Sequence, residues 1–308
     1  MQNNEIKNMP IPQKTSSSRV ERSLQEKVVL AISLAAIIFF VYILLSVNIF
    51  PALGINLPII PYSDGLKIIT ASIAAFFCFW YFRGLKTALI GFIAIFWLTW
   101  LLEFLSGHLG IFGGTYSYDQ ANFPGPVIGG TPLFLGFQHY AYYFFMSYFI
   151  ANLIIDSSVF SRVQSWWKRS LFVSFISSFI VVGIDMLADP VQVNVFHLWQ
   201  WTNTSEYYSI PYNNYLGYIV IYTILLFVYK YIEKKLKAES IGPTLLIIGL
   251  VPLIMYFSRY LEYASADLGG IFLIGGLTML LPGIIAVDRL LLFIKKEKSE
   301  KSGLPSDR

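Results

Sequence analysis

Charged residues are scarce in this sequence. Asp, Glu, Lys and Arg make up only 13% of the 308 residues, whereas a soluble domain contains about 25%. Hydrophobic residues account for 56%, and the mean hydropathy is +0.62. This composition excludes a nucleic-acid-binding protein, a disordered regulator and an ordinary cytosolic enzyme, and it indicates an integral membrane protein.

Cysteine and histidine are scarce as well. Cys78 stands alone in an apolar run, which excludes a disulfide framework and a cysteine-based metal motif. The three histidines, His108, His139 and His197, lack the spacing of a helical metal-binding pair. A zinc site built from these histidines and nearby carboxylates stays an alternative. We favour hydrogen-bonding roles for them and predict neither a metal nor a cofactor.

Long apolar runs are abundant. No cleavable signal peptide is expected, because the first run is of spanning length and lacks a small-residue cleavage site. Each run can cross a hydrocarbon core about 30 Å thick. The sequence therefore predicts an all-α, polytopic membrane helix bundle of about eight transmembrane helices. The runs cover roughly residues 28–47, 66–82, 87–105, 132–155, 170–189, 214–231, 242–260 and 271–294.

The basic residues predict the sidedness of this bundle. Of the 22 Lys and Arg residues, 20 lie in the two tails or in alternate connections, and only Lys67 and Arg259 lie at the other face. Basic residues accumulate on the cytoplasmic side, so we expect both termini to be cytoplasmic. We predict a disordered basic tail over 1–27, a membrane-embedded catalytic bundle over 28–294 and a Lys-rich tail over 295–308, in a multi-pass protein of the cell membrane. Two long non-cytoplasmic loops follow, at 106–131 and 190–213.

Glu103, Asp185 and Asp189 lie within the apolar runs, where an ionisable side chain is costly and indicates function. Glu103 lies near the outer end of the third run, and Asp185 and Asp189 lie at the outer end of the fifth, four residues apart and so on one helix face. The helix C-terminus and partial desolvation both favour the uncharged acid, which is the form that a general acid requires. The alternative is structural: these groups cap helix ends, bind loop amides or pair with Arg259.

Aromatic residues are concentrated in and beside the two long loops. They form either an interfacial belt or a wall that binds a polyene and surrounds a cationic intermediate with π faces. We expect Arg259 to pair with Glu262, three residues away, and to help orient an acid, with His108 and His139 in supporting positions. The candidate substrate-binding residues are Phe112, Tyr116, Tyr118, Trp199, Trp201, Tyr207, Tyr208, Asn214 and Tyr215.

Several motifs, taken in order, resemble those of the carotenoid biosynthesis integral membrane proteins. The resemblance covers roughly residues 85–290. The chain departs from the pattern at Ser209, where Gly is expected, at Tyr218, where Trp is expected, and at Gly136-Phe137, where Trp is usual. The motifs are Glu103-x-x-x-Gly107-x-x-x-Ile111-Phe112-Gly113, Tyr116-x-Tyr118, Thr131-Pro132, Asp185-x-x-x-Asp189-Pro190, Trp199-x-Trp201 and Tyr207-Tyr208-x-Ile210-Pro211-x-x-Asn214-Tyr215-x-Gly217.

The resemblance implies addition of water to the terminal C=C, the ψ-end, of an acyclic C40 or C50 carotenoid, as in γ-carotene hydratase and bisanhydrobacterioruberin hydratase. Asp185 or Asp189, and after them Glu103, would protonate the alkene, and water would capture the tertiary cation to give a tertiary alcohol. The expected partners are the carotenoid in the bilayer, water and other membrane enzymes of carotenoid synthesis, but no nucleic acid. Two alternatives stay open: a non-catalytic carotenoid- or lipid-binding subunit of a carotenoid-synthesis complex, and a zinc-dependent membrane hydrolase.

Overall fold

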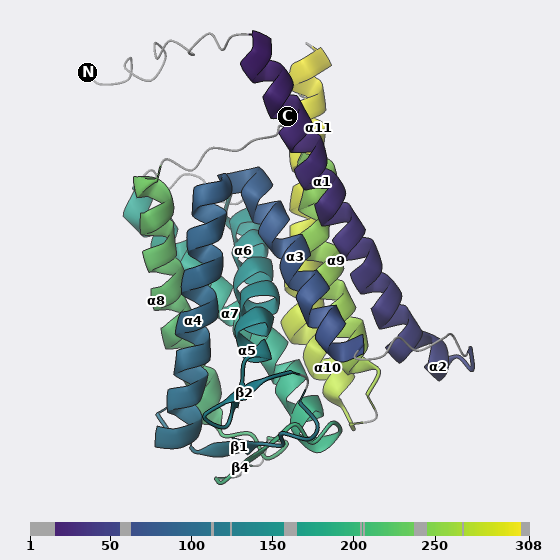
Figure 1. Ribbon diagram of the computed structural model, residues 1–308, viewed down its shortest axis with the longest axis vertical. Helices are drawn as coiled ribbons and strands as arrows, with labels where there is room; N and C mark the ends of the chain where they lie inside the picture. Colours follow the sequence, from purple (N-terminus) through teal and green to yellow (C-terminus); the bar gives the residue numbers. More distant parts are fainter. Residues whose placement is uncertain are drawn as a thin grey trace.

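The computed structural model describes residues 16–55, 63–111, 114–123, 125–156, 165–203, 205, 207–236, 245–266 and 268–302. Figure 1 shows long helices that run roughly parallel or antiparallel to one another, which confirms the all-α bundle. The helical segments are α1 Ser16–Leu44, η1 Leu45–Ile49, α2 Phe50–Ala52, α3 Ser63–Arg83, α4 Leu85–Leu109, α5 Phe134–Gln138, η2 His139–Phe145, α6 Met146–Asp156, α7 Trp166–Asn194, α8 Tyr212–Lys235, α9 Leu245–Ala264, α10 Ile271–Gly275, η4 Gly276–Leu280 and α11 Leu281–Ser302.

Six helical stretches among the described residues are long and apolar enough to cross a membrane. Two further ones, α9 and the continuous run α5–η2–α6, lie within the bundle (Figure 1). The first turn of α1 and the last turn of α11 lie at the same end of the molecule, as an even number of crossings requires. The predicted number of eight spans and their sidedness stay predictions. The six stretches are Leu24–Val47, Asp64–Arg83, Leu85–Leu109, Trp166–Asn194, Tyr212–Lys235 and Ile271–Lys295.

The run α5–η2–α6 forms the centre of the bundle. It packs against α3, α4, α7, α9 and α11, and every residue of η2 is buried. A helix that is apolar all round is typical of such a fully enclosed position. The π-helical segment η2 begins at His139, and wider helical turns of this kind occur often at functional sites.

Helices α4 and α8 lie at one edge of the bundle. Only 28% of the apolar window of each is buried, compared with 67% for α3 and for α7. Their outward side chains are large and apolar, as lipid-facing positions require. Examples are Ile93, Trp97, Val220 and Ile224, each more than half exposed.

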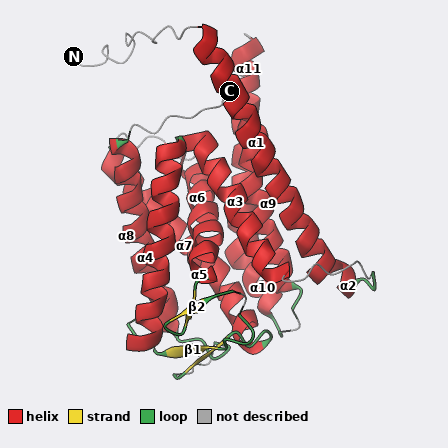
Figure 2. Cartoon of the chain, viewed as in Figure 1, coloured by secondary structure: helices red, strands yellow, loops and turns green. Residues whose placement is uncertain are grey.

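The two long loops meet at one end of the bundle, which we call the loop end (Figure 2). Strand β1 (Tyr116–Tyr118) comes from the first loop and pairs antiparallel with β4 (Trp199–Trp201) from the second. A smaller hairpin joins β2 (Val127–Ile128) to β3 (Thr131–Pro132). The two long loops were predicted from the sequence, but the pairing of a strand from one with a strand from the other was not.

The structure corrects several predicted boundaries. Helix α1 begins at Ser16, inside the predicted disordered tail, and α11 continues to Ser302, beyond the predicted start of the Lys-rich tail. Glu, Arg, Lys, Leu and Gln favour helix, so a polar segment of this composition can extend an adjoining span. At the loop end, α4 continues to Leu109 and α7 to Asn194. The described residues do not include 1–15 or 303–308.

Candidate functional site

Glu103 is the centre of a hydrogen-bonded cluster at the loop end. Its Oε2 accepts hydrogen bonds from the hydroxyls of Tyr116, at 2.5 Å, and Tyr118, at 2.9 Å. Its Oε1 accepts one from Tyr218, at 3.0 Å, and lies 3.2 Å from His139 Nε2. Glu103 therefore faces four donors that come from three separate parts of the chain.

His139 connects Glu103 to a further tyrosine. Its Nδ1 lies 2.7 Å from the hydroxyl of Tyr222, and both side chains are buried. A neutral imidazole satisfies every group here, because Nε2 donates to Glu103 while Nδ1 accepts from Tyr222. Tyr218 and Tyr222 are four residues apart on α8, so they reach this cluster from the same helix face.

Asp185 and Asp189 form a second cluster beside the first. They share one face of α7, as predicted. Asn214 Nδ2 donates to Oδ2 of both, at 3.1 Å and 3.0 Å, and Tyr143 donates to Asp185 Oδ1 at 2.7 Å. Asn214 therefore fixes the first turn of α8 against α7, and its predicted contact with substrate stays a prediction.

The aromatic residues of the two loops close this end of the bundle. In the β1–β4 pair, Tyr116 lies opposite Trp201 and Tyr118 lies opposite Trp199. Because side chains alternate along a strand, these four rings share one face and turn inward, whereas Ser117 and Gln200 between them are exposed. The ring centroids of Tyr116 and Trp201 are 4.6 Å apart.

The two inward tyrosines stay protonated. Burial raises the pKa of the Tyr116 and Tyr118 hydroxyls well above the usual range, and the neighbouring Glu103 carboxylate raises both further. Each hydroxyl therefore acts as a donor to Glu103 throughout the physiological pH range.

Two small cavities adjoin the acidic groups. One, of about 20 Å³, is lined by Glu103 and Asp189 together with the β1–β4 aromatics. The other, also of about 20 Å³, lies between α4 and α8 and includes Leu102 and Ile221 in its lining. Asp185 lines neither cavity. The residues that line both are Glu103, Tyr116, His139, Asn214 and Tyr218.

Tyr207 has a structural role in α7. Pro190 lies inside this helix and lacks the N–H that would bind the carbonyl of Met186. The hydroxyl of Tyr207 donates to that carbonyl at 2.7 Å. The helix therefore continues past the predicted end at Asp189, because a loop residue replaces the missing hydrogen bond.

Other predicted residues lie outside the two cavities. Tyr208 donates to the carbonyl of Gly269, and Tyr215 packs on Tyr207 with ring centroids 5.7 Å apart. His108 contacts the carbonyl of Phe104 and His197 that of Val193. Among the described residues, no group of three or more His, Cys, Asp or Glu side chains is placed to hold a metal ion. Phe112 lies outside the described residues.

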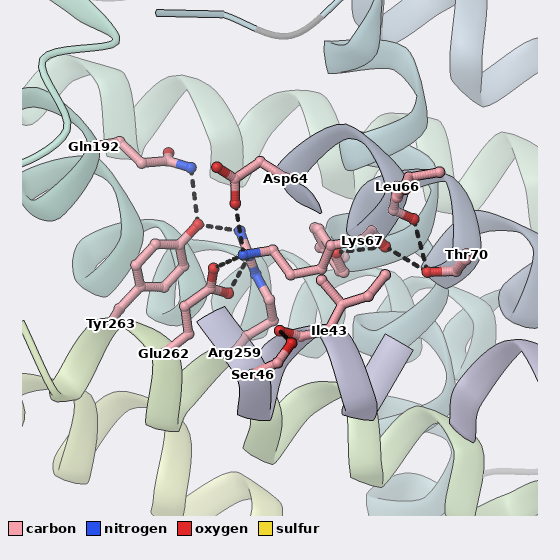
Figure 3. Close-up of polar contacts among 11 residues, drawn as sticks. Ile43, Ser46, Asp64, Leu66, Lys67, Thr70, Gln192, Arg259, Glu262 and Tyr263 are labelled. Carbon is pink, nitrogen blue, oxygen red and sulfur yellow. Dashed lines mark hydrogen bonds and ion pairs between the residues drawn. The ribbon is translucent and has the colours of Figure 1, made fainter. Parts of the chain in front are cut away.

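Arg259 belongs to a separate buried cluster, shown in Figure 3. It pairs with Glu262, as predicted, and Glu262 also binds Lys67, which is 3.2 Å from Asp64. The guanidinium lies over the rings of Tyr142 and Tyr263. Arg259 makes no ion pair with the three candidate acids in the described structure, because Glu262 binds its charged end; the prediction that Arg259 orients one of them is therefore corrected.

A single chain of contacts leads from Arg259 to the helix that carries the acidic pair. Arg259 donates to the hydroxyl of Tyr263, which also accepts from Gln192 Nε2 at 2.8 Å (Figure 3). Gln192 lies three residues after Asp189 on α7. This cluster therefore holds the loop end of α7 in place rather than taking part in the site itself.

Three residues of the site were missed from the sequence: Tyr143, Tyr218 and Tyr222. A signal was present for each. Tyr143 follows His139 by four residues in a predicted span, and Tyr222 follows Tyr218 by four in another. Polar groups with this spacing lie on one helix face, but the sequence does not show that the two faces turn toward Glu103.

Comparison with known proteins agrees with the motifs in this site. Residues 64–282, most of the chain, match the family described as carotenoid biosynthesis protein. Neither the curated proteins nor the solved structures contain a significant match. The match includes Glu103, the Asp185–Asp189 pair, Asn214 and the β1–β4 aromatics. The chain is a membrane protein that belongs to the carotenoid biosynthesis protein family, and its role lies in carotenoid biosynthesis.

Proposed function

We propose that the protein is a carotenoid hydratase of the cell membrane, which adds water to the terminal C=C of an acyclic carotenoid. The observation that carries this proposal is that Asn214 holds Asp185 and Asp189 together next to a cavity that Asp189 and Glu103 line. Hydration of an alkene needs a proton donor and a group that takes a proton from water. The Asp185–Asp189 pair offers the proton donor, and the Glu103 cluster offers the group that accepts a proton.

The Asp185–Asp189 pair is suited to hold a proton. Asn214 Nδ2 donates to one oxygen of each, and two carboxylates held this close repel each other, which favours a proton on one of them. Among the residues that the structure describes, neither forms an ion pair with a Lys, Arg or His side chain. Asp189 lines the cavity and Asp185 does not, so Asp189 is the proposed donor and Asp185 its proton-sharing neighbour.

Glu103 is suited to the opposite role. A carboxylate has about four acceptor positions, and Glu103 faces four donors. This environment supports the ionised form. An anion at this position stabilises a nearby carbocation, and it accepts a proton from water after one of the four donors gives up its place to the water.

The reaction is then balanced in two steps. Asp189 transfers its proton to the less substituted alkene carbon, which leaves a tertiary cation on the other carbon. Water bonds to that carbon and releases one proton to Glu103, and this proton returns to the Asp pair through water before the next cycle. Tyr116, Trp199 and Trp201 surround the cation with aromatic faces that contribute about 0.5–2 kcal/mol each.

The test is expression in a bacterial host that accumulates an acyclic C40 or C50 carotenoid, followed by mass spectrometry of the pigments. The wild type should yield a product heavier by one or two waters, with an unchanged polyene spectrum. Asp189→Asn should abolish this product, because the amide cannot supply the proton. Glu103→Gln should reduce it by about 100-fold, as loss of general acid–base catalysis typically does.

Asp119→Asn is the matched control. Asp119 is an exposed loop acid whose side chain accepts hydrogen bonds from the Ala121 N–H and the Asn122 amide, and this variant should keep full activity. Full activity in the Asp189→Asn variant would refute the proton-donor assignment. A wild type that binds the pigment without changing its mass would instead favour the non-catalytic carotenoid-binding subunit.

A further inference from the structure

The cavity between α4 and α8 opens toward the lipid-facing edge of the bundle. Far from the loop end, the two helices are in close contact: a Cβ at Gly91 would lie 2.9 Å from the Tyr229 ring, and the Tyr229 hydroxyl lies 3.4 Å from the Thr87 carbonyl. Toward the loop end a small cavity of about 20 Å³ lies between them, beside the hydrogen bond from Tyr218 to Glu103. The two helices are therefore packed directly at one end and enclose a small cavity at the other.

The mouth of this cavity is apolar. Leu102 on α4 and Ile221 on α8 line it and are partly exposed. Leu101 and Val220 beside them are 44% and 57% exposed. Apolar side chains at an exposed edge of a membrane bundle face lipid tails, so this mouth faces the hydrocarbon of the bilayer.

The chemistry of the lining selects for an uncharged ligand. Glu103 is its only acidic residue, and none of the lining residues is Lys or Arg. A phosphate or carboxylate headgroup that entered here would meet the Glu103 carboxylate without any cation to balance it, which is costly in an apolar setting. A neutral hydrocarbon meets no such penalty.

We propose that the small cavity between α4 and α8 marks a lateral entrance through which the terminal isoprene unit of a neutral polyene reaches Glu103 and the acidic pair, while the rest of the chain stays in the bilayer. This inference rests on the proposed function for the reaction at its inner end. As it stands the cavity of about 20 Å³ has room for about one water molecule. It therefore accepts only the end of the polyene, and Leu102 and Ile221 rotate aside to admit it.

The test uses substitutions that narrow the mouth of the cavity and leave Glu103, Asp185 and Asp189 unchanged. Leu102→Trp and Ile221→Trp should each lower hydration of the polyene by about tenfold or more, which corresponds to about 1.4 kcal/mol. The controls are Ile93→Trp and Ile224→Trp, at positions that are 54% and 58% exposed and do not line the cavity, and both should keep wild-type turnover. Leu102→Phe is a milder variant that should give an intermediate loss and serves if the Trp variants do not fold.

A second measurement separates binding from chemistry. In an Asp189→Asn background, the pigment that copurifies with the protein is measured by its absorbance. Leu102→Trp should lower this amount several-fold and Ile93→Trp should not. Squalene, a neutral isoprenoid hydrocarbon, should displace the pigment, whereas geranylgeranyl diphosphate should not.

These outcomes distinguish the entrance from the reaction. If the wild type performs no hydration, the hydratase proposal is refuted. If the mouth variants nevertheless lose their bound pigment, that loss supports the entrance. Hydration and pigment binding that are unchanged in the Trp variants would refute the entrance alone. Equal displacement by the diphosphate would overturn the assignment of a neutral ligand.

Discussion

Tyr218 shows how one hydroxyl contributes to the proposed site. It donates to Glu103 at 3.0 Å, and a hydrogen bond to a charged group contributes about 1.5–3 kcal/mol. If Glu103 stabilises the cation, Tyr218→Phe should lower turnover by about 10- to 150-fold. The measurement is the rate of water addition to the acyclic carotenoid in membranes.

Tyr218→Trp is the matched variant for this test. Trp is the residue that the family resemblance leads us to expect, and its indole N–H is a donor. This variant should retain much more activity than Tyr218→Phe. Equal activity in the two variants would show that the donor to Glu103 is unimportant.

Ser209 is the second departure from the family pattern, and its backbone explains why Gly is expected there. Its φ is +66°, in the left-handed region that costs residues with a Cβ roughly 1–2 kcal/mol. Replacement of Ser209 by Gly removes this cost. Part of the resulting stabilisation is lost, because Gly has greater conformational freedom in the unfolded chain. We expect Ser209→Gly to raise the free energy of unfolding by about 0.5–1 kcal/mol.

Thermal unfolding of the purified protein in detergent checks this expectation. Ser117→Gly is the control, because Ser117 is an exposed strand residue that is not among those with positive φ. Glycine in a strand is unfavourable, so this variant should unfold at a lower temperature than the wild type. A fall in unfolding temperature for Ser209→Gly would contradict the strain argument.

At the scale of elements, α3 and α9 are joined through buried charges (Figure 3). Glu262 binds both Lys67 and Arg259, and the side chains of all three are at most 5% exposed. Glu262→Gln would leave two buried cations without their shared carboxylate. Removal of one partner from a buried ion pair destabilises a protein by about 3–5 kcal/mol, so this variant should unfold at a much lower temperature.

Asp64→Asn is the control within the same network. Asp64 also contacts Lys67, but its side chain is 68% exposed, and exposed ion pairs contribute only about 0–1 kcal/mol. A nearly unchanged unfolding temperature is expected. If the two variants behaved alike, burial of the Lys67–Glu262–Arg259 cluster would not be what stabilises this region.

Helix α7 shows where local sequence rules fail at this scale. Asp189-Pro190 predicts a helix end, since proline lacks a donor and restricts the residue before it. The Tyr207 hydroxyl supplies the missing bond to the Met186 carbonyl, and α7 continues to Asn194. Tyr207 follows Pro190 by 17 positions, so no local pattern reveals this compensation.

At the scale of the whole molecule, the sidedness predicted from the basic residues can be tested with single cysteines, because Cys78 is buried. Gln200→Cys, at an exposed position on β4, should react with a membrane-impermeant maleimide in intact cells. Lys86→Cys, at an exposed position near the start of α4, should react only after the membrane is permeabilised. The reverse pattern would overturn the assignment of both termini to the cytoplasm.

The sequence by itself determined what depends on local chemistry. Runs of apolar residues specified the helices, and the spacing of Asp185 and Asp189 placed them on one helix face. The alternation in Tyr116-x-Tyr118 and Trp199-x-Trp201 matches strands with one inward face. These features follow from periods of two and 3.6 residues, which a single segment contains.

The tertiary structure alone decided which groups meet. It paired β1 with β4, turned Tyr218 and His139 toward Glu103, and brought Lys67 to Glu262. It also placed Asp189, but not Asp185, beside a cavity. These contacts join residues far apart in the chain, and they depend on how whole helices pack and rotate against one another, which the periodicity of a single segment does not specify.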